Sequence, residues 1–126
     1  MLSRKLLFSN VLINGAGAST SAGVYIGEDV VRVESLQLQV TSVAGTADVK
    51  AEYATSWDNV TYDSIADTTD ITSSTLLDKA NNPEGVNVFP VSAPLNRYIK
   101  ITITGVAANP ADTLVTAYLI LREGYA

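Results

Sequence analysis

Three aspartates that lie close together, Asp63, Asp67 and Asp70, are the residues best suited to bind a metal ion. Carboxylate oxygens, with hydroxyl and carbonyl oxygens nearby, are the ligands that calcium prefers. Their spacing matches no EF-hand loop, and an acidic loop rich in Thr is commonly just solvated. A glycosidase would need two carboxylates at a defined separation across a cleft, which nothing in the sequence indicates. We therefore keep these residues as calcium candidates, with a solvated loop as the plainer interpretation.

Two aromatic residues, Trp57 and Tyr62, flank a predicted hairpin tip that contains Asp58 and Asn59. An exposed aromatic ring can stack on a sugar ring or anchor a protein partner, and the polar residues between the rings would then reach sugar hydroxyls. In the alternative interpretation, which the sequence alone favours, Trp57 folds back and caps the core. Trp57 and Tyr62 are thus candidate stacking residues for a carbohydrate.

The chain contains no histidine and no cysteine among its 126 residues. Ser-His-Asp and Cys-His arrangements cannot be built without them, and the usual zinc, copper and haem sites lack their ligands. The glycines at 15 and 17 give a superficial likeness to a dinucleotide loop. Phosphate binding there would need the N-terminus of a following helix, and none is predicted. We therefore expect no cofactor and no enzymatic activity.

The charge of the chain argues against two classes of partner. With 8 basic and 13 acidic residues, the net charge is −5, and such a surface repels phosphate backbones. The longest apolar run near the C-terminus, Ala117 to Leu121, is far shorter than the ~20 residues of a membrane-spanning helix. We expect neither nucleic acid nor a membrane as a partner.

The same composition favours an oligomer. Charged residues make up 17% of the chain, whereas about 25% is usual in soluble domains. The difference suggests that another subunit covers part of the surface. A neutral surface rich in Thr, Ser and Asn is the plainer alternative.

Apolar and polar residues alternate with a period of two, which predicts strands. The alternation is clearest over residues 36–41 and 99–104, and turn residues separate the runs. About eight antiparallel strands then form one all-β domain over residues 1–126, a β-sandwich or jelly roll. The predicted strands are residues 5–13, 23–27, 30–41, 47–55, 60–65, 86–92, 97–105 and 112–122.

Two segments could contact other subunits. Residues 15–23 are all small, so residues 1–22 form either an N-terminal arm with its linker or a strand and a surface loop. Residues 114–121 are apolar on both faces, so this strand is either covered on both sides or faces a neighbouring subunit. The predicted interface residues are Leu6, Leu7, Phe8, Leu114, Tyr118 and Ile120.

Residues 51–62, Ala-Glu-Tyr-Ala-Thr-Ser-Trp-Asp-Asn-Val-Thr-Tyr, resemble a hairpin that is common in virion proteins of tailed bacteriophages. The hairpin reads strand, Ser-x-Asp-Gly-x-x-Trp/Tyr, strand, and Asn59 stands here where Gly is usual. Residues 94–101, Pro-Leu-Asn-Arg-Tyr-Ile-Lys-Ile, resemble the strand that pairs with it. The same pairing occurs in discoidin-like sandwich modules, and the resemblance covers less than half of the chain.

The resemblance implies a structural role and carries over no catalytic residues. Small, acidic, cysteine-free β-proteins recur among phage head decoration (cement) proteins, which sit as trimers or dimers on the capsid and clamp neighbouring capsomers. By this resemblance the chain forms a homo-oligomer, with a trimer favoured over a dimer, and its partner is the major capsid protein. The location is the virion, assembled in the host cytoplasm. Another virion part remains open, and so does a carbohydrate-binding module that uses Trp57 and Tyr62.

Overall fold

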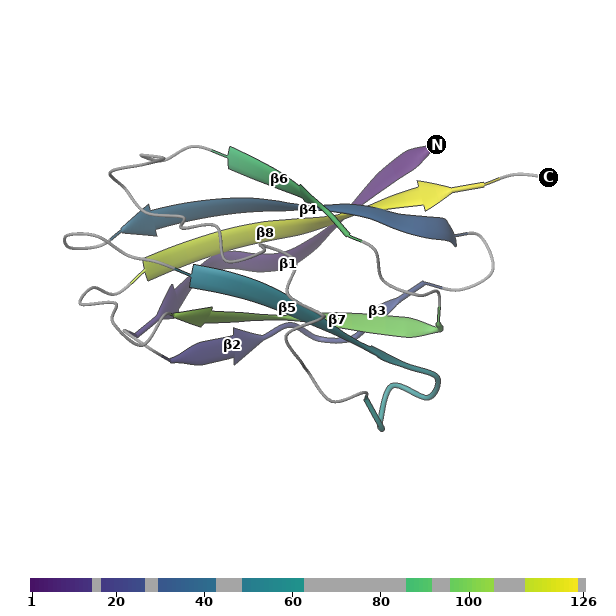
Figure 1. Ribbon diagram of the computed structural model, residues 1–126, viewed down its shortest axis with the longest axis horizontal. Helices are drawn as coiled ribbons and strands as arrows, with labels where there is room; N and C mark the ends of the chain where they lie inside the picture. Colours follow the sequence, from purple (N-terminus) through teal and green to yellow (C-terminus); the bar gives the residue numbers. More distant parts are fainter. Residues whose placement is uncertain are drawn as a thin grey trace.

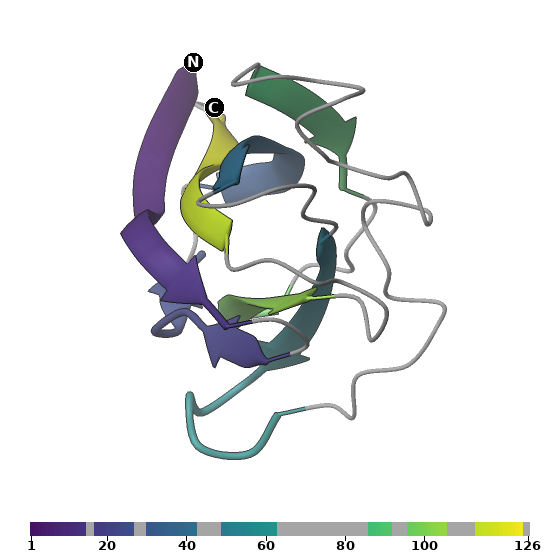
Figure 2. The ribbon, with the colours of Figure 1, turned by 90° about the vertical axis from the view of Figure 1, so that its left-hand side faces the viewer.

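The computed structural model describes residues 1–14, 17–26, 30–42, 49–62, 86–91, 96–105 and 113–124. These residues form an antiparallel β-sandwich, in which two sheets face each other (Figures 1 and 2). The predicted all-β fold is confirmed. The strands are β1 (Leu2–Ile13), β2 (Ala18–Thr20), β3 (Val24–Tyr25), β4 (Val30–Ser42), β5 (Val49–Ser56), β6 (Val86–Pro90), β7 (Tyr98–Gly105) and β8 (Thr113–Glu123).

The first sheet has four strands in the order β1-β8-β4-β6. In the second sheet β7 is central, with β2 and β3 side by side along one edge and β5 along the other. Thr102 shows this arrangement, because it pairs with Thr20 on one side and with Glu52 on the other. The short strands β2 and β3 therefore act together as one interrupted edge.

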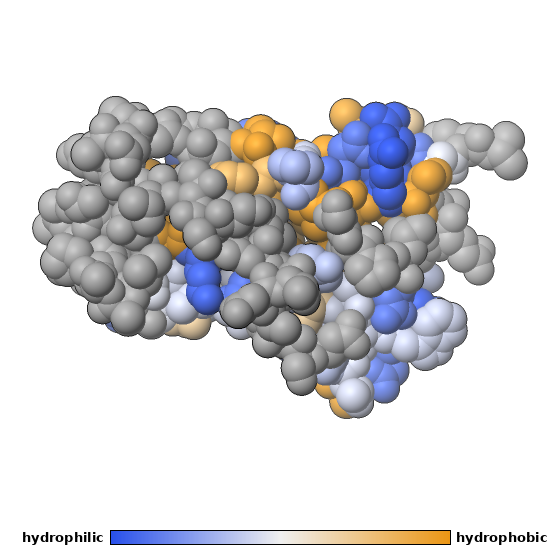
Figure 3. All heavy atoms as spheres, in the orientation of Figure 1, coloured by the Kyte–Doolittle hydropathy of each residue, from blue (hydrophilic) through white to orange (hydrophobic). Residues whose placement is uncertain are grey.

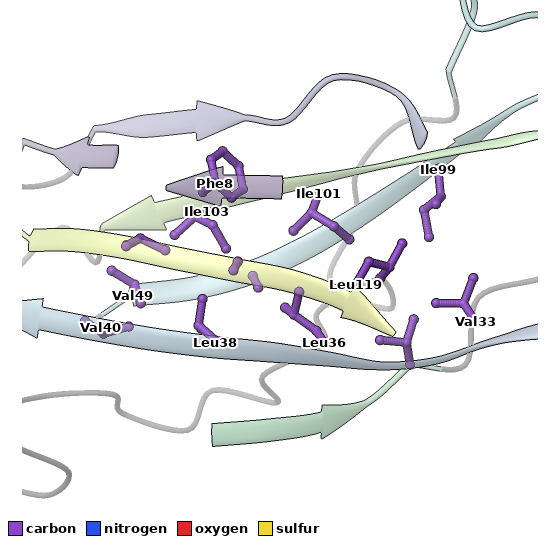
Figure 4. Packing of buried hydrophobic residues seen from close by; sticks show 14 of the residues in the cluster. Phe8, Val33, Leu36, Leu38, Val40, Val49, Ile99, Ile101, Ile103 and Leu119 are labelled. Carbon is purple, nitrogen blue, oxygen red and sulfur yellow. The ribbon is translucent and has the colours of Figure 1, made fainter. Parts of the chain in front are cut away.

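The core lies between the two sheets and is built by the alternation seen in the sequence. Leu36 and Leu38 of β4, with Ile99 and Ile101 of β7, are fully buried and point toward one another (Figure 4). The apolar cluster continues through Leu119 of β8. The predicted core faces over residues 36–40 and 99–103 are thus confirmed.

The last strand, β8, lies between β1 and β4 in the first sheet. Its core face is almost completely buried: Val115, Ala117, Leu119 and Leu121. The alternate residues, from Leu114 to Arg122, are only half-buried on the opposite face. The two apolar faces of β8 therefore differ in role: one fills the core, whereas the sandwich leaves the other partly exposed.

Two local predictions fail. The predicted strand over residues 60–65 does not form in its described part: Val60 and Thr61 belong to a turn, and Tyr62 makes only an isolated bridge to Ser56. Strand β2 lies within the small-residue segment, where the sequence indicated no strand. Its residues pair because the edge of β7 offers free backbone groups, which can bond to any residue type.

The N-terminal segment, for which an arm was one of the two possibilities, lies in the first sheet in this structure. β1 pairs with β8 along its length, with register shifts between Leu6 and Phe8 and between Phe8 and Val11. Asn10, inside the second shift, has a φ of 48°. Such bulges bend and twist an edge strand, which hinders pairing with further chains.

Candidate binding surfaces

Four aromatic and two basic residues meet at one end of the second sheet, and we call this group the aromatic cluster. Its members are Tyr25, Trp57, Tyr62, Arg97, Tyr98 and Lys100. They come from β3, from the turn after β5, and from the start of β7 with the residue just before it. The alternation that buries Ile99 on the core side places Tyr98 and Lys100 on the outer side.

Ring contacts hold the cluster together. Tyr25 and Tyr98 meet edge to face, with centroids 5.4 Å apart and an interplanar angle of 86°. The Arg97 guanidinium carbon lies 5.1 Å from the centroid of the Trp57 ring and 6.0 Å from that of Tyr25. Lys100 Nζ lies 4.2 Å from the centroid of the Tyr62 ring. These contacts fall within the range of cation–π interactions.

The turn after β5 presents Trp57 to solvent. Asp58 Oδ1 accepts hydrogen bonds from the backbone N–H groups of Val60 (2.9 Å) and Thr61 (2.8 Å). Asn59 has a φ of 61°, a conformation that Asn tolerates better than most residues, which explains why it can replace the usual Gly. Trp57 is 68% exposed. The interpretation in which Trp57 caps the core is therefore wrong.

Electrostatics fixes the protonation of the polar groups in this turn. The backbone hydrogen bonds from Thr61 and Val60 lower the pKa of Asp58, so its carboxylate is ionised at neutral pH. Burial, followed by the fields of Tyr98 and Asp58, raises the pKa of Tyr62. The Tyr62 hydroxyl is therefore protonated and donates a hydrogen bond to Asn59 Oδ1.

A groove of about 330 Å³ runs between β1 and the segment that links β2 to β3, a size within the usual range of ligand sites. It reaches the aromatic cluster at Tyr25, which belongs to both. Gly23 lies under the turn: a Cβ there would collide with the Asn59 and Tyr62 side chains. The residues that line the groove are Lys5, Leu6, Leu7, Ser21, Ala22, Gly23, Val24 and Tyr25.

A second surface, which we call the outer face, is the side of the first sheet that points away from the core. Register places Leu6 opposite Tyr118, Arg4 opposite Ile120 and Leu12 opposite Leu114 on this face. Three leucines of β1 are strongly exposed: Leu2 (53%), Leu6 (55%) and Leu12 (48%). The face continues to β6, where apolar atoms gather at the surface (Figure 3).

The cations of the outer face are held by ring and ion-pair contacts. The Arg4 guanidinium lies 4.2 Å from the centroid of the Tyr118 ring. Glu34 bonds to both Arg32 Nε (2.5 Å) and Arg122 Nε (3.4 Å). The hydrogen bonds from Arg32 and then Arg122 lower the pKa of Glu34, so this carboxylate stays ionised.

Of the predicted interface residues, the outer face brings together Leu6, Leu114, Tyr118 and Ile120. Phe8 is 5% exposed and belongs to the core, so it is not available for contact. The register shift after Leu6 turns Phe8 to the opposite face, which a strict alternation would not do. Leu7 is half-buried and packs against the core cluster.

The remaining site predictions concern metals and membranes. Asp63, Asp67 and Asp70 lie outside the described residues. Among the residues that the structure describes, no group of three acidic, His or Cys side chains could hold a metal ion. No helix in the described ranges is long and apolar enough to cross a membrane.

Sequence reasoning identified Trp57 and Tyr62 but missed the other members of the aromatic cluster. Tyr25, Arg97 and Lys100 lie far from the turn in the sequence and meet it only because β3 and β5 both pair with β7. The alternation over residues 98–101 was the available signal, since it places Tyr98 and Lys100 on the same side of β7. Tyr25 lay in the predicted strand over residues 23–27, but no pattern indicated that it belongs to a binding surface. The strand that forms there has only two residues.

The fold and these surfaces define a β-sandwich with two exposed candidate binding surfaces. No family model matches the chain, and the curated proteins contain no match to it. Its fold is similar to that in the crystal structure of the PBSX exported protein XepA, with a TM-score of 0.59 and 10% sequence identity. The similarity covers 98% of this chain and 38% of the XepA chain, so the chain spans well under half of that protein.

Proposed function

We propose that this chain is a non-enzymatic phage structural protein that works through protein–protein contacts of its outer face. In the finer form of the proposal it is a capsid decoration protein. Copies associate, with a trimer favoured, and bind the major capsid protein in the virion. The observation that carries the proposal is the set of exposed leucines on β1 beside Tyr118 and Ile120 of β8.

Physical chemistry supports an interface at this face. Three strongly exposed leucines on one strand, beside half-buried apolar side chains on the next, leave apolar area in contact with water. Contiguous exposed apolar surface is typical of protein interaction sites, whose buried centres are depleted in charge. Arg4, held against Tyr118, adds a residue type that is enriched in interfaces.

The phage assignment rests on two supports. The turn after β5 and the first part of β7 resemble the paired hairpin and strand of tailed-phage virion proteins. XepA, whose fold is similar, is described as an exported protein of PBSX. The absence of His and Cys from the sequence supports a non-enzymatic role.

Light scattering coupled to size-exclusion chromatography tests the proposal. We expect the wild-type chain to run as a trimer and the Leu6→Lys variant as a monomer, because a lysine at a closed apolar contact would bury an unpaired charge. Val60→Lys is the matched control, because Val60 is 82% exposed and lies in the turn after β5, away from the outer face.

Cosedimentation with capsids of the major capsid protein then tests attachment. The wild type and Val60→Lys should sediment with the capsids, whereas Leu6→Lys should stay in the supernatant. A wild-type chain that remains monomeric at high concentration and does not sediment would overturn the proposal.

A second candidate function, saccharide binding, is favoured by the exposure of Trp57 beside Tyr25 and Arg97. Flat aromatic rings suit the apolar faces of sugars, and the groove that begins at Tyr25 gives room for further units. Trp57 is the only tryptophan of the chain, so its fluorescence reports directly on this site. Titration with neutral and acidic oligosaccharides tests the candidate.

A further inference from the structure

We propose that the aromatic cluster and the groove together bind a saccharide that carries carboxylate groups. The proposal rests on the second candidate function and deepens it by naming the charge of the ligand. It follows from how the cations of the described residues are distributed between ion pairs and ring contacts.

The described cations fall into two groups. Arg32 and Arg122 form ion pairs with Glu34, and Lys50 pairs with Glu52. Four side chains, in contrast, form no ion pair with any residue that the structure describes: Arg4, Lys5, Arg97 and Lys100. Three of the four, Lys5, Arg97 and Lys100, lie at the groove or in the aromatic cluster, whereas Arg4 lies over Tyr118 on the outer face.

Arg97 is held in a position that suits carboxylate binding. Its guanidinium lies over the rings of both Trp57 and Tyr25, which restricts its motion. A guanidinium carries five N–H donors in a planar fork, which matches the two oxygens of a carboxylate. Within the described residues no side-chain hydrogen bond engages this fork. Among the described side chains, none therefore competes for these donors with a ligand that stacks on the adjacent rings.

The carboxylate of the turn competes little for these cations. Asp58 is the acidic residue of the turn, and its Oδ1 accepts bonds from Val60 and Thr61. The other described carboxylates are bound on other strands: Glu34 and Glu52 in ion pairs, and Glu123 by Ser3. Together with Lys5, the described part of the site thus contains three cations and one anion. The anion is Asp58, whose Oδ1 already accepts hydrogen bonds from the backbone of the turn.

The shape of the site fits an extended ligand. Tyr25 joins the groove to the Arg97 end of the cluster, and Gly23 joins it to the Tyr62 and Lys100 end. A linear oligosaccharide could place one ring against Trp57 and further units along the groove toward Lys5. Repeated carboxylates, one on each sugar, would then meet successive cations.

Isothermal titration calorimetry with three tetrasaccharides tests the inference. The probes are tetragalacturonate and tetramannuronate, which are acidic, and maltotetraose, which is neutral. We expect at least one acidic probe to bind about tenfold or more tightly than maltotetraose at low salt, and this preference to shrink as salt screens the charges. The wild-type signal is confirmed by the fluorescence of Trp57.

Arg97→Gln and Lys100→Gln should each weaken acidic-probe binding by about tenfold more than they weaken maltotetraose binding. Arg4→Gln is the matched control, because its guanidinium also lies over a tyrosine ring but on the outer face. Trp57→Ala should abolish binding of every probe. Unfolding curves that match the wild type establish that each variant is folded, and the two glutamine variants test the charge independently.

The outcomes distinguish the preference for an acidic saccharide from saccharide binding itself. Equal binding of acidic and neutral probes, unaffected by Arg97→Gln and Lys100→Gln, would overturn the acidic inference and leave saccharide binding in place. No saturable binding of any probe at millimolar concentration would overturn both. Neither result bears on assembly through the outer face, which Leu6→Lys tests separately.

Discussion

The outer surfaces of the two sheets differ, although both sheets enclose the same core. The outer face of the first sheet carries the exposed Leu2, Leu6 and Leu12, and Glu34 neutralises two of its arginines. The exposed end of the second sheet is aromatic, and its Arg97 and Lys100 contact rings and form no ion pair with the described residues. Aliphatic side chains suit close packing against a protein, whereas flat rings with cations suit flat, charged ligands.

The difference arises because strand alternation constrains only the residues that face the core. In β7 and β8 every second residue must be apolar to fill the core, as Ile101 and Leu119 do, both fully buried. The residues between them face outward and are under no such requirement. One strand can therefore expose Tyr118 and Ile120 while the other exposes Tyr98 and Lys100, and two kinds of surface arise on one scaffold.

The largest effect on stability is expected when a buried leucine is compared with an exposed one. Leu119→Ala should lower the free energy of unfolding by about 2–5 kcal/mol, because Leu119 is fully buried between the sheets. Leu6→Ala should change it by less than about 0.5 kcal/mol in dilute protein, because Leu6 is exposed.

Urea denaturation at low protein concentration measures both values. A loss for Leu6→Ala as large as that for Leu119→Ala, at every concentration, would contradict the placement of Leu6 on an open face. A loss that appears only at high concentration would support self-association through this face.

The next effect concerns the packing under the aromatic cluster. Gly23→Val should displace the turn after β5, because a side chain there collides with Asn59 and Tyr62. We expect a loss of stability of about 1–3 kcal/mol and the loss of saccharide binding. Ala18→Val, at an exposed position of β2 that does not line the groove, is the matched control and should leave both unchanged.

Denaturation and fluorescence of Trp57 measure the two consequences of Gly23→Val. Unchanged Trp57 fluorescence and unchanged ligand binding would show that the turn does not depend on Gly23. If saccharide binding were lost while the variant still ran as a trimer, the outer face and the cluster would be shown to act independently.

A smaller effect follows from the carboxylate that orders the turn. The pKa of Asp58 is lower in the folded state, so its stabilisation of the turn is fully present above the unfolded pKa and is lost as pH falls through the folded pKa. We expect Trp57 fluorescence to change below the ordinary range of aspartate titration. In Asp58→Asn this acid transition should disappear, and its persistence would assign it to another group.

The sequence predicted the framework better than the sites. Alternation identified β4 and β7 because each fills the core with every second residue. It missed β2, whose small residues pair only because the edge of β7 is available. It also placed Phe8 beside Leu6, because a bulge leaves no mark in a single sequence.

The candidate site shows the same limit. Trp57 and Tyr62 stand together in one turn and could be identified from it. Their partners Tyr25, Arg97 and Lys100 come from two other strands, so only the pairing of β3 and β5 with β7 brings them together. The exposure of Trp57 also depends on local hydrogen bonds of Asp58, which composition does not reveal.

The smallest effect is expected for the ion pairs of the outer face. Glu34→Gln removes the charge that Arg32 and Arg122 share. Because these side chains are partly exposed, water and salt screen the pairs, and the melting temperature should fall only slightly at low salt and not measurably at high salt. The pKa of Glu34 is lowered, so this contribution is present above its unfolded pKa and is lost in acid.

Glu123→Gln is the matched control for Glu34→Gln, because its carboxylate accepts a bond from Ser3 Oγ and forms no ion pair within the described residues. A scanning calorimetry series in salt should distinguish the two variants only below physiological ionic strength. A large effect of Glu34→Gln on the trimer would mean that the arginines it neutralises lie inside the contact. In that case both surfaces would bind their partners through arginine. The remaining difference would be that Glu34 pairs with arginines of the outer face, whereas no described carboxylate pairs with Arg97.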